Sequence, residues 1–278
     1  MANAIKKYPV PLIFKKILKD QLSGELIVTG SHFTKTLFFS DGRLAFSSST
    51  LESEHLGEIL VTSGKITRPQ LEQALQIKKN LSFKDQKLGE ILVKLTYLEK
   101  RDYYYALKDQ VKQVAVSTLP LKEGEWRFIV KTPEIPNPHS FKIKLPEIIH
   151  EGIMAIDDFS YFKKRFVYRA PVTTPISEMV FSSLTPEEMQ LYSELTSFSN
   201  ISVEQLLMKL KVRDGEKERR FWQILMLFYY LNAVDFVEYT VDEEQNKNVE
   251  EIYDLYEKIK AKRLNYYQLF GVENPNNW

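Results

Sequence analysis

The hydrophobic and polar positions near the N-terminus predict one short helix followed by strands. Leu12 to Lys19 has helical spacing, and Gly24 to Gly30 (GELIVTG) is an apolar, β-branched run between two glycines, as is typical of a strand. Asp41-Gly42 is a two-residue turn that favours positive φ and matches the twist of paired strands. We therefore expect Thr36 to Ser40 and Arg43 to Ser47 to form a β-hairpin.

Helical spacing then replaces the strand pattern over a long stretch. It holds from about Glu54 to Leu119, and strand character returns only at Gly124 to Val130 (GEWRFIV), before a Pro-rich stretch and FKIKL. A sheet that gives way to helices and then resumes indicates an insertion. The sequence therefore predicts an α+β fold, in which a small antiparallel sheet carries a helical-hairpin repeat inserted at residues 54–112.

The insert contains the same six letters twice. LGEILV occurs at Leu56 to Val61 and at Leu88 to Val93. In each copy a bend and a second helix follow, which we expect at Arg68 to Lys79 and at Lys100 to Gln113. The two copies are predicted to stack as two helical hairpins.

Both copies have a glycine early in the first helix, at Gly57 and Gly89. Glycine lowers helix stability at such a position unless another group must approach the backbone closely. That group is either the other copy or a ligand. Gly64 suits the bend of the first copy because glycine can adopt positive φ at a helix end, whereas the second copy has Thr96 there.

The pattern after the sheet predicts a mostly helical domain. The prolines of Ala170-Pro171 and Thr174-Pro175 indicate a break in regular structure. Capping boxes at Thr185 and Ser202 start two short helices, Asp214 to Leu231 forms a longer one, and VDFVEYTV alternates like an edge strand. Three helices followed by a strand are the outline of a winged-helix domain. We expect a sheet domain at 1–145, a winged-helix-like domain at 146–244 and a C-terminal helical segment at 245–278.

The composition is that of an ordinary globular protein, with 278 residues, 44% hydrophobic and 27% charged. The net charge is +1, and basic and acidic residues are interspersed, which does not favour nucleic-acid binding. The chain has no Cys, no apolar run long enough for a membrane span and no secretory leader pattern. The sequence predicts a cytoplasmic protein that does not insert into membranes.

No residue pattern indicates an enzyme, a cofactor or a metal site. The four histidines lack ligand spacing, and the glycines form no phosphate-binding loop. Two carboxylate pairs, Asp157-Asp158 and Glu187-Glu188, are predicted to be structural, because adjacent helix residues point about 100° apart. Glu187-Glu188 also belongs to a capping box. We therefore expect a non-enzymatic protein.

The tandem copies resemble the N-terminal domain of type II secretion and type IV pilus assembly ATPases, some of which bind cyclic di-GMP. The matching positions are Leu56, Gly57, Leu60, Gly64, Ile66, Leu71 and Leu75, and then Leu88, Gly89, Leu92, Leu98, Leu107 and Gln110. The resemblance implies a nucleotide site at His55, Leu56, Gly57, Gly64, Lys78, Lys87, Leu88, Gly89 and Gln110. His55 and Lys87 replace the family's Arg, and Lys78 replaces its first Gln. Neither Lys nor His reproduces the forked contact of Arg with guanine or phosphate.

The strands around the insert are similar to the PATAN family, a bacterial domain often attached to response regulators and implicated in motility and signalling through protein contacts. The similarity covers about residues 5–132 and rests on GELIVTG, the FFSDGRLAFSS hairpin and LKEGEWRFIV. The family supplies no catalytic residues. It implies binding to a response regulator or a motility component.

The segment Asn265 to Val272 (NYYQLFGV) resembles the opening of a J domain. The His-Pro-Asp tripeptide that engages an Hsp70 chaperone is absent from this sequence. An Hsp70 partner is therefore expected only if the natural chain continues into a full J domain.

These observations predict a non-enzymatic protein–protein interaction adaptor in bacterial signalling, with surface motility as a setting. Tyr103, Tyr104 and Tyr105 are the expected contact residues, because three consecutive tyrosines on one helix cannot all face the core. Exposed aromatic side chains are effective anchors at interfaces. The first alternative is a cyclic di-GMP receptor that uses the repeated hexapeptides.

The second alternative is a winged-helix DNA-binding regulator. Its longest helix begins GEKERRFWQ, where Lys217, Arg219 and Arg220 could meet phosphates. The following turns, ILMLFYYL, are apolar on nearly every side. A helix of that kind is buried, whereas a recognition helix needs a polar face for the groove, so the pattern disfavours this alternative.

Overall fold

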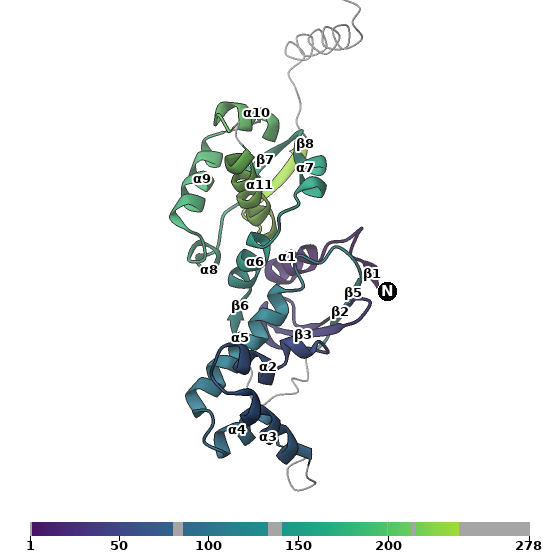
Figure 1. The fold of residues 1–278 in the computed structure, drawn as a ribbon. Helices are drawn as coiled ribbons and strands as arrows, with labels where there is room; N and C mark the ends of the chain where they lie inside the picture. The colour runs from purple at the N-terminus through teal and green to yellow at the C-terminus, as the bar shows by residue number, and fades with distance from the viewer. Residues whose placement is uncertain (1, 80–85, 133–140, 199, 213–214, 239–278) are drawn as a thin grey trace, which may run out of the picture.

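The chain has an α+β fold (Figure 1). The computed structural model describes residues 2–79, 86–132, 141–198, 200–212 and 215–238. Its larger sheet is antiparallel, with the strand order β1-β5-β2-β3-β4-β6. The strands are β1 (Asn3–Ala4), β2 (Gly24–Thr29), β3 (Thr34–Ser40), β4 (Arg43–Ser49), β5 (Glu125–Val130) and β6 (Ile143–Lys144). The predicted fold class is confirmed.

The predicted hairpin is formed by β3 and β4. Asp41 and Gly42 adopt φ values of 50° and 67°, so both turn residues are left-handed, as a two-residue hairpin turn requires. Ser40 pairs with Arg43 directly across this turn. The Asp41-Gly42 turn therefore determines the connection and the register beside it, and the register shifts once farther along, between Phe38 and Phe39.

The helical insert lies between β4 and β5, as predicted. It consists of a short 3-10 helix η1 (Glu52–Glu54) and the helices α2 (Leu56–Thr62), α3 (Arg68–Lys79), α4 (Leu88–Lys94) and α5 (Lys100–Val116). β5 then pairs with β2 along its whole length, with Gly24 opposite Val130 and Thr29 opposite Glu125. The strand after the insert thus belongs to the same sheet as the strands before it.

Two helices cover the core face of the sheet. In α1 (Val10–Asp20), the ring of Phe14 meets the ring of Phe39 on β3 edge-on, with centroids 5.7 Å apart. α5 packs on β4, where the hydroxyl of Ser47 donates a hydrogen bond of 2.8 Å to the carbonyl of Val111. α5 is therefore both part of the insert and part of the sheet's core.

The remaining elements form a mostly helical part with a second, two-stranded sheet. They are α6 (Leu145–Met154), α7 (Ser160–Phe166), β7 (Arg169–Thr173), α8 (Glu178–Phe181), α9 (Pro186–Ser197), α10 (Val203–Lys209), α11 (Gly215–Tyr230) and β8 (Val234–Glu238). The three predicted helices correspond to α9, α10 and α11, and the predicted edge strand corresponds to β8.

The break predicted at Ala170-Pro171 is wrong, because both residues lie within β7. Ala170 pairs with Val237 and Pro171 with Phe236 of β8. A two-stranded sheet leaves one side of each strand without a partner, and a proline can occupy a strand there because its missing N–H is not needed. Proline therefore did not end regular structure at this position.

The sheet and the helical part share one continuous hydrophobic core. α6 begins at Leu145 and packs against α1, α5 and α11, so it contacts both parts (Figure 1). The side-chain amide of Asn232 also donates a hydrogen bond of 3.1 Å to the backbone carbonyl of Lys15. The C-terminal segment at 245–278, with its J-domain-like ending, lies outside the described residues.

Candidate binding surface on the duplicated insert

The two copies of the repeat stack on each other, as predicted. α2 and α3 of the first copy both contact α4 of the second, and α2 also contacts α5. Two polar contacts join the copies: the hydroxyl of Tyr97 donates to the side-chain oxygen of Gln73 at 2.6 Å, and Lys65 lies 3.3 Å from the carboxylate of Asp102. The insert is therefore one packed unit.

Gly57 is buried because two leucines lie over it. A Cβ atom at Gly57 would be 2.6 Å from Cδ1 of Leu71 in α3 and 3.1 Å from Cδ2 of Leu88 in the other copy. Both distances are shorter than a van der Waals contact. The close neighbours of this glycine are therefore its own second helix and the other repeat.

Gly89 is covered by an aromatic ring. A Cβ atom at Gly89 would lie 2.1 Å from Cε2 of Tyr103, which α5 directs onto it. Burial, together with nearby Glu90, raises the pKa of the Tyr103 hydroxyl. Tyr103 is only 6% exposed, so its inclusion among the contact residues was wrong: it fills the space over Gly89 and does not face solvent.

The bends of the two copies have the same left-handed backbone. Gly64 has φ 69° and Thr96 has φ 57°. Each donates its N–H to the residue three positions before it, Val61 and Val93 respectively, at 3.0 Å. Gly64 therefore serves the bend, as expected, and Thr96 adopts the same conformation in spite of its branched side chain.

Two polar residues of the nucleotide alternative, Gln110 and His55, contact backbone carbonyls. The side-chain amide of Gln110 donates a hydrogen bond of 2.7 Å to the carbonyl of Glu54, and His55 lies 3.2 Å from the carbonyl of Ser49. Burial lowers the pKa of Lys87 although Glu90 opposes this, and Lys78 is exposed on α3. Leu56 and Leu88 pack against the core. These contacts favour a structural role for the repeat.

A buried ion pair fastens the insert to the sheet. Lys35 of β3 is 3% exposed, and its ammonium group lies 2.7 Å from the carboxylate of Glu54 and 2.7 Å from the hydroxyl of Ser117. A buried charge needs such partners to offset its desolvation. Together with the hydrogen bond of Gln110 to Glu54, this cluster holds both ends of the insert. The strand pattern of the sequence did not predict the cluster.

Tyr104 and Tyr105 lie on the outer side of α5. They are 44% and 55% exposed, and their rings meet edge-on with centroids 5.8 Å apart. The ring of Tyr104 also lies 5.4 Å from that of Phe141, and the guanidinium of Arg101 lies 5.7 Å from the ring centre of Tyr105. Two of the three predicted contact residues are therefore at the surface, in a defined arrangement.

An open groove of about 480 Å³ begins beside Tyr105. It runs between α2, α5 and the start of α6, and we call it the repeat groove. Its walls combine apolar residues such as Ile59 and Ile143 with charged side chains of both signs. The lining residues are Ile59, Ser63, Lys65, Asp102, Tyr105, Ala106, Lys108, Asp109, Lys112, Ile143 and Glu147.

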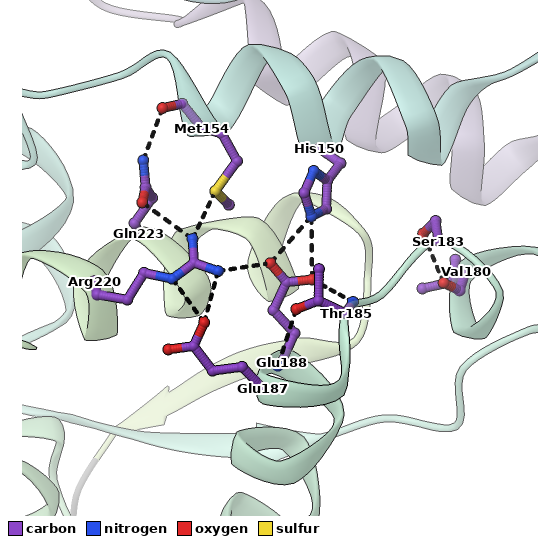
Figure 2. Close-up of polar contacts among 9 residues, drawn as sticks. All are labelled: His150, Met154, Val180, Ser183, Thr185, Glu187, Glu188, Arg220 and Gln223. Carbon is purple, nitrogen blue, oxygen red and sulfur yellow. Dashed lines mark hydrogen bonds and ion pairs between the residues drawn. The ribbon is translucent and has the colours of Figure 1, made fainter.

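Sequence reasoning missed a polar cluster that joins α6, α9 and α11 (Figure 2). Glu188 is fully buried; its carboxylate lies 3.0 Å from His150 and 3.3 Å from Arg220, and it accepts a hydrogen bond from the backbone N–H of Thr185. Burial alone would raise the pKa of Glu188, but the hydrogen bonds from His150 and Thr185 outweigh burial and lower it. Only the Thr185 cap could be predicted, because the other partners are distant in sequence.

The arginines of the DNA alternative are engaged in ion pairs. Arg220 contacts Glu187 at 2.9 Å as well as Glu188, and Arg219 pairs with Asp157. In α11, Phe221 to Phe228 is buried throughout. Asp158, the neighbour of Asp157 in the sequence, accepts a hydrogen bond from the backbone N–H of Ser160 and forms an ion pair with Lys122. α11 thus serves as a core element. The Asp157-Asp158 and Glu187-Glu188 pairs both have structural partners.

Comparison with protein-family models, with curated proteins and with solved structures finds no match for this chain. Across the described ranges, no cluster of three or more His, Asp or Glu side chains is arranged to hold a metal ion. In the same residues, no helix combines the length and the apolar character needed to cross a bilayer. The surfaces of the insert are therefore the features from which a function can be proposed.

Proposed function

We propose that this protein is a non-enzymatic adaptor of the bacterial cytoplasm, which binds another protein through the outer side of α5. The observation that supports this proposal is the pair of exposed tyrosines, Tyr104 and Tyr105, beside the repeat groove. Tyrosine buries a large area with few rotatable bonds and keeps a hydroxyl for hydrogen bonding.

The first copy of the repeat supplies an internal comparison. Glu72 and Gln73 of α3 occupy the positions that correspond to Tyr104 and Tyr105, and both are exposed. The same scaffold thus has polar residues at these positions in one copy and aromatic residues in the other. Folding of the hairpin does not require tyrosine there, which supports a role in binding.

The repeat groove has the composition of a transient interface. Apolar side chains such as Ile59 and Ile143 line it together with Tyr105, and Lys65 and Asp102, which also line it, form an ion pair. Protein interfaces commonly combine an aromatic anchor with a polar, solvated rim. The similarity of the surrounding strands to the PATAN family supports a response regulator or a motility component as the partner.

The proposal is tested with a double variant, Tyr104→Glu/Tyr105→Gln, which places the side chains of the first copy on the second. Both replacements are good helix formers, so α5 should still form. The matched control is Glu72→Ala, which alters the equivalent exposed site of the first copy.

The partner is first captured from a bacterial lysate on the immobilised protein, then identified, purified and titrated calorimetrically against the three proteins. Loss of an aromatic anchor typically weakens an interface by about 2 kcal/mol or more, roughly 30-fold. We expect that loss for the double variant and an unchanged affinity for Glu72→Ala. Equal affinity of the double variant and the wild type would contradict the proposal.

A further inference from the structure

Basic side chains from α1, α7 and β7 gather around Tyr229 of α11. The ammonium group of Lys15 lies 3.4 Å from the centre of the Tyr229 ring. Burial raises the pKa of the Tyr229 hydroxyl, and Arg165 and Arg169 lie near enough to oppose this. Lys19, one helical turn after Lys15 on α1, lies near enough to repel its charge. We call the surface formed by Lys15, Lys19, Arg165 and Arg169 the basic face.

The positive charge of this surface is locally concentrated. α7 and β7 lie between Asp158 and Glu178, and no acidic residue occurs in that interval. The whole chain has a net charge of only +1. Within the ranges that the structure describes, no side chain of the basic face forms an ion pair. The basic face can therefore offer its charges to an anionic partner.

Two carboxylates of β8 lie beside the basic face without balancing it. Burial lowers the pKa of Lys15 to about 8, although nearby Asp235 opposes this. Glu238 is opposite Arg169 in the strand pairing. A lowered pKa means that the charge of this ammonium group is not fully compensated. A further anionic group would therefore stabilise the charged form of Lys15.

Exposed apolar and aromatic side chains lie next to these charges. Val172 of β7 and Val237 of β8 are 44% and 47% exposed, and Val172 is opposite Asp235 in the register. Tyr161 is 45% exposed, and its hydroxyl accepts a hydrogen bond of 3.2 Å from the guanidinium of Arg165. Arginine and aromatic residues are both enriched at protein interfaces. This surface thus combines ionic and apolar contacts.

We propose that the basic face binds an acidic peptide segment of a second partner protein. Carboxylates of the peptide would pair with the guanidinium forks of Arg165 and Arg169, and its apolar side chains would lie on Val172 and Val237. A nucleic acid fits less well, because it carries a phosphate at every nucleotide and would place some of them beside Asp235. This binding is independent of the proposed docking on α5; with both, the protein would join two partners.

The proposal is tested by fluorescence anisotropy with the full chain and a labelled peptide of alternating Glu and Val, at physiological ionic strength. A matched peptide with Gln in place of Glu removes the charge, and an oligothymidylate of similar length offers phosphates instead. We expect saturable binding of the acidic peptide. The neutral peptide should bind about tenfold more weakly, and the oligonucleotide should also bind more weakly than the acidic peptide.

Three variants locate the site, each checked for folding by thermal melting. Arg165→Gln/Arg169→Gln removes two charges and should weaken the acidic peptide about five- to tenfold. Val172→Thr keeps the branched shape and should weaken it about threefold, a loss that charge attraction alone would not produce. Lys78→Gln/Lys79→Gln removes two exposed charges from α3, far from the basic face, and should bind as the wild type does (Figure 1).

Three results would overturn the proposal. They are no saturable binding of the acidic peptide by the full chain, an equal loss in the α3 variant, and tighter binding of the oligonucleotide than of the peptide. The chain's own acidic stretch at residues 242–257 is a rival occupant. If it holds the basic face, the full chain will not bind the peptide, which is the first of these results.

Discussion

The two copies of the repeat use their glycines alike and their surfaces differently. In the first copy Leu71 of α3 packs over Gly57, and in the second copy Tyr103, at the equivalent position of α5, packs over Gly89. Each glycine therefore allows the second helix of its own hairpin to approach the first. Helix packing therefore explains the repeated sequence. Residues that differ between the two copies are the candidates for a role in binding.

The copies also differ in what surrounds them. The second copy lies against the sheet through α5, whereas α3 of the first copy packs mainly on α4 (Figure 1). Substitutions in the second copy should consequently disturb the packing of the protein's core. Substitutions in the first copy should disturb packing mostly within the insert. Four substitutions test this difference, from the largest expected effect to the smallest.

Gly89→Ala should be the most damaging. Its Cβ would lie 2.1 Å from the ring of Tyr103, which is buried and cannot swing away without opening the core. Overpacking of this kind costs about 1–3 kcal/mol, and we expect a loss of about 3 kcal/mol in the free energy of unfolding. Urea denaturation measures it.

A double variant provides the control for Gly89→Ala. Gly89→Ala/Tyr103→Leu places the leucine of the first copy opposite the new methyl group and removes the ring that it would strike. The double variant should lose clearly less than the sum of the two single variants. Additive losses would show that Gly89 and Tyr103 are not in contact.

Gly64→Thr should cost about 1–2 kcal/mol through the backbone alone. Gly64 has φ 69°, and a Cβ there would meet no atom within 4 Å, so only the left-handed conformation penalises the side chain. Gly64→Asn is the control, because Asn tolerates this conformation better. Equal losses for Thr and Asn, measured by urea denaturation, would contradict this explanation.

Gly57→Ala should lower the free energy of unfolding by about 0.5–1 kcal/mol, clearly less than Gly89→Ala. Its Cβ would strike the ends of two flexible leucines, at 2.6 Å for Leu71 and 3.1 Å for Leu88. The higher helix propensity of Ala, worth about 1 kcal/mol, partly offsets that strain. A loss as large as that of Gly89→Ala in the same denaturation series would show that the leucines cannot yield.

Thr96→Gly should be the reciprocal and smallest change, a gain of about 0.5 kcal/mol. Thr96 is a β-branched residue at φ 57°, and glycine would remove the strain of that conformation. Glycine also adds entropy to the unfolded chain, which offsets part of the gain. The measurement is the shift in the urea midpoint at an unchanged m-value. A loss of stability would mean that the Thr96 side chain contributes more than its backbone costs.

Local patterns were sufficient for most of the fold. The Asp41-Gly42 turn, the returning strand at Trp126 and the capping box at Thr185 are each determined by neighbours in the sequence, and all were predicted. Pro171 was misjudged, because its place in a strand depends on β8, which lies far away in the chain.

The candidate site was predicted only in part. The sequence showed that Tyr103, Tyr104 and Tyr105 cannot all be buried, but it could not say which one faces inward. That depends on Gly89, fourteen positions before Tyr103, and on the angle at which two helices pack. The cluster of His150, Glu188 and Arg220 unites residues from distant elements, and no local pattern contains such information.

The space over Gly57 and Gly89 is filled by Leu71, Leu88 and Tyr103. We therefore propose that the repeat acts as a scaffold and does not bind a nucleotide there. Calorimetric titration of the full chain with cyclic di-GMP tests this most directly. We expect no saturable heat up to millimolar nucleotide. Saturable binding at micromolar concentration that is abolished by Gly57→Leu, in a variant that still folds, would contradict it.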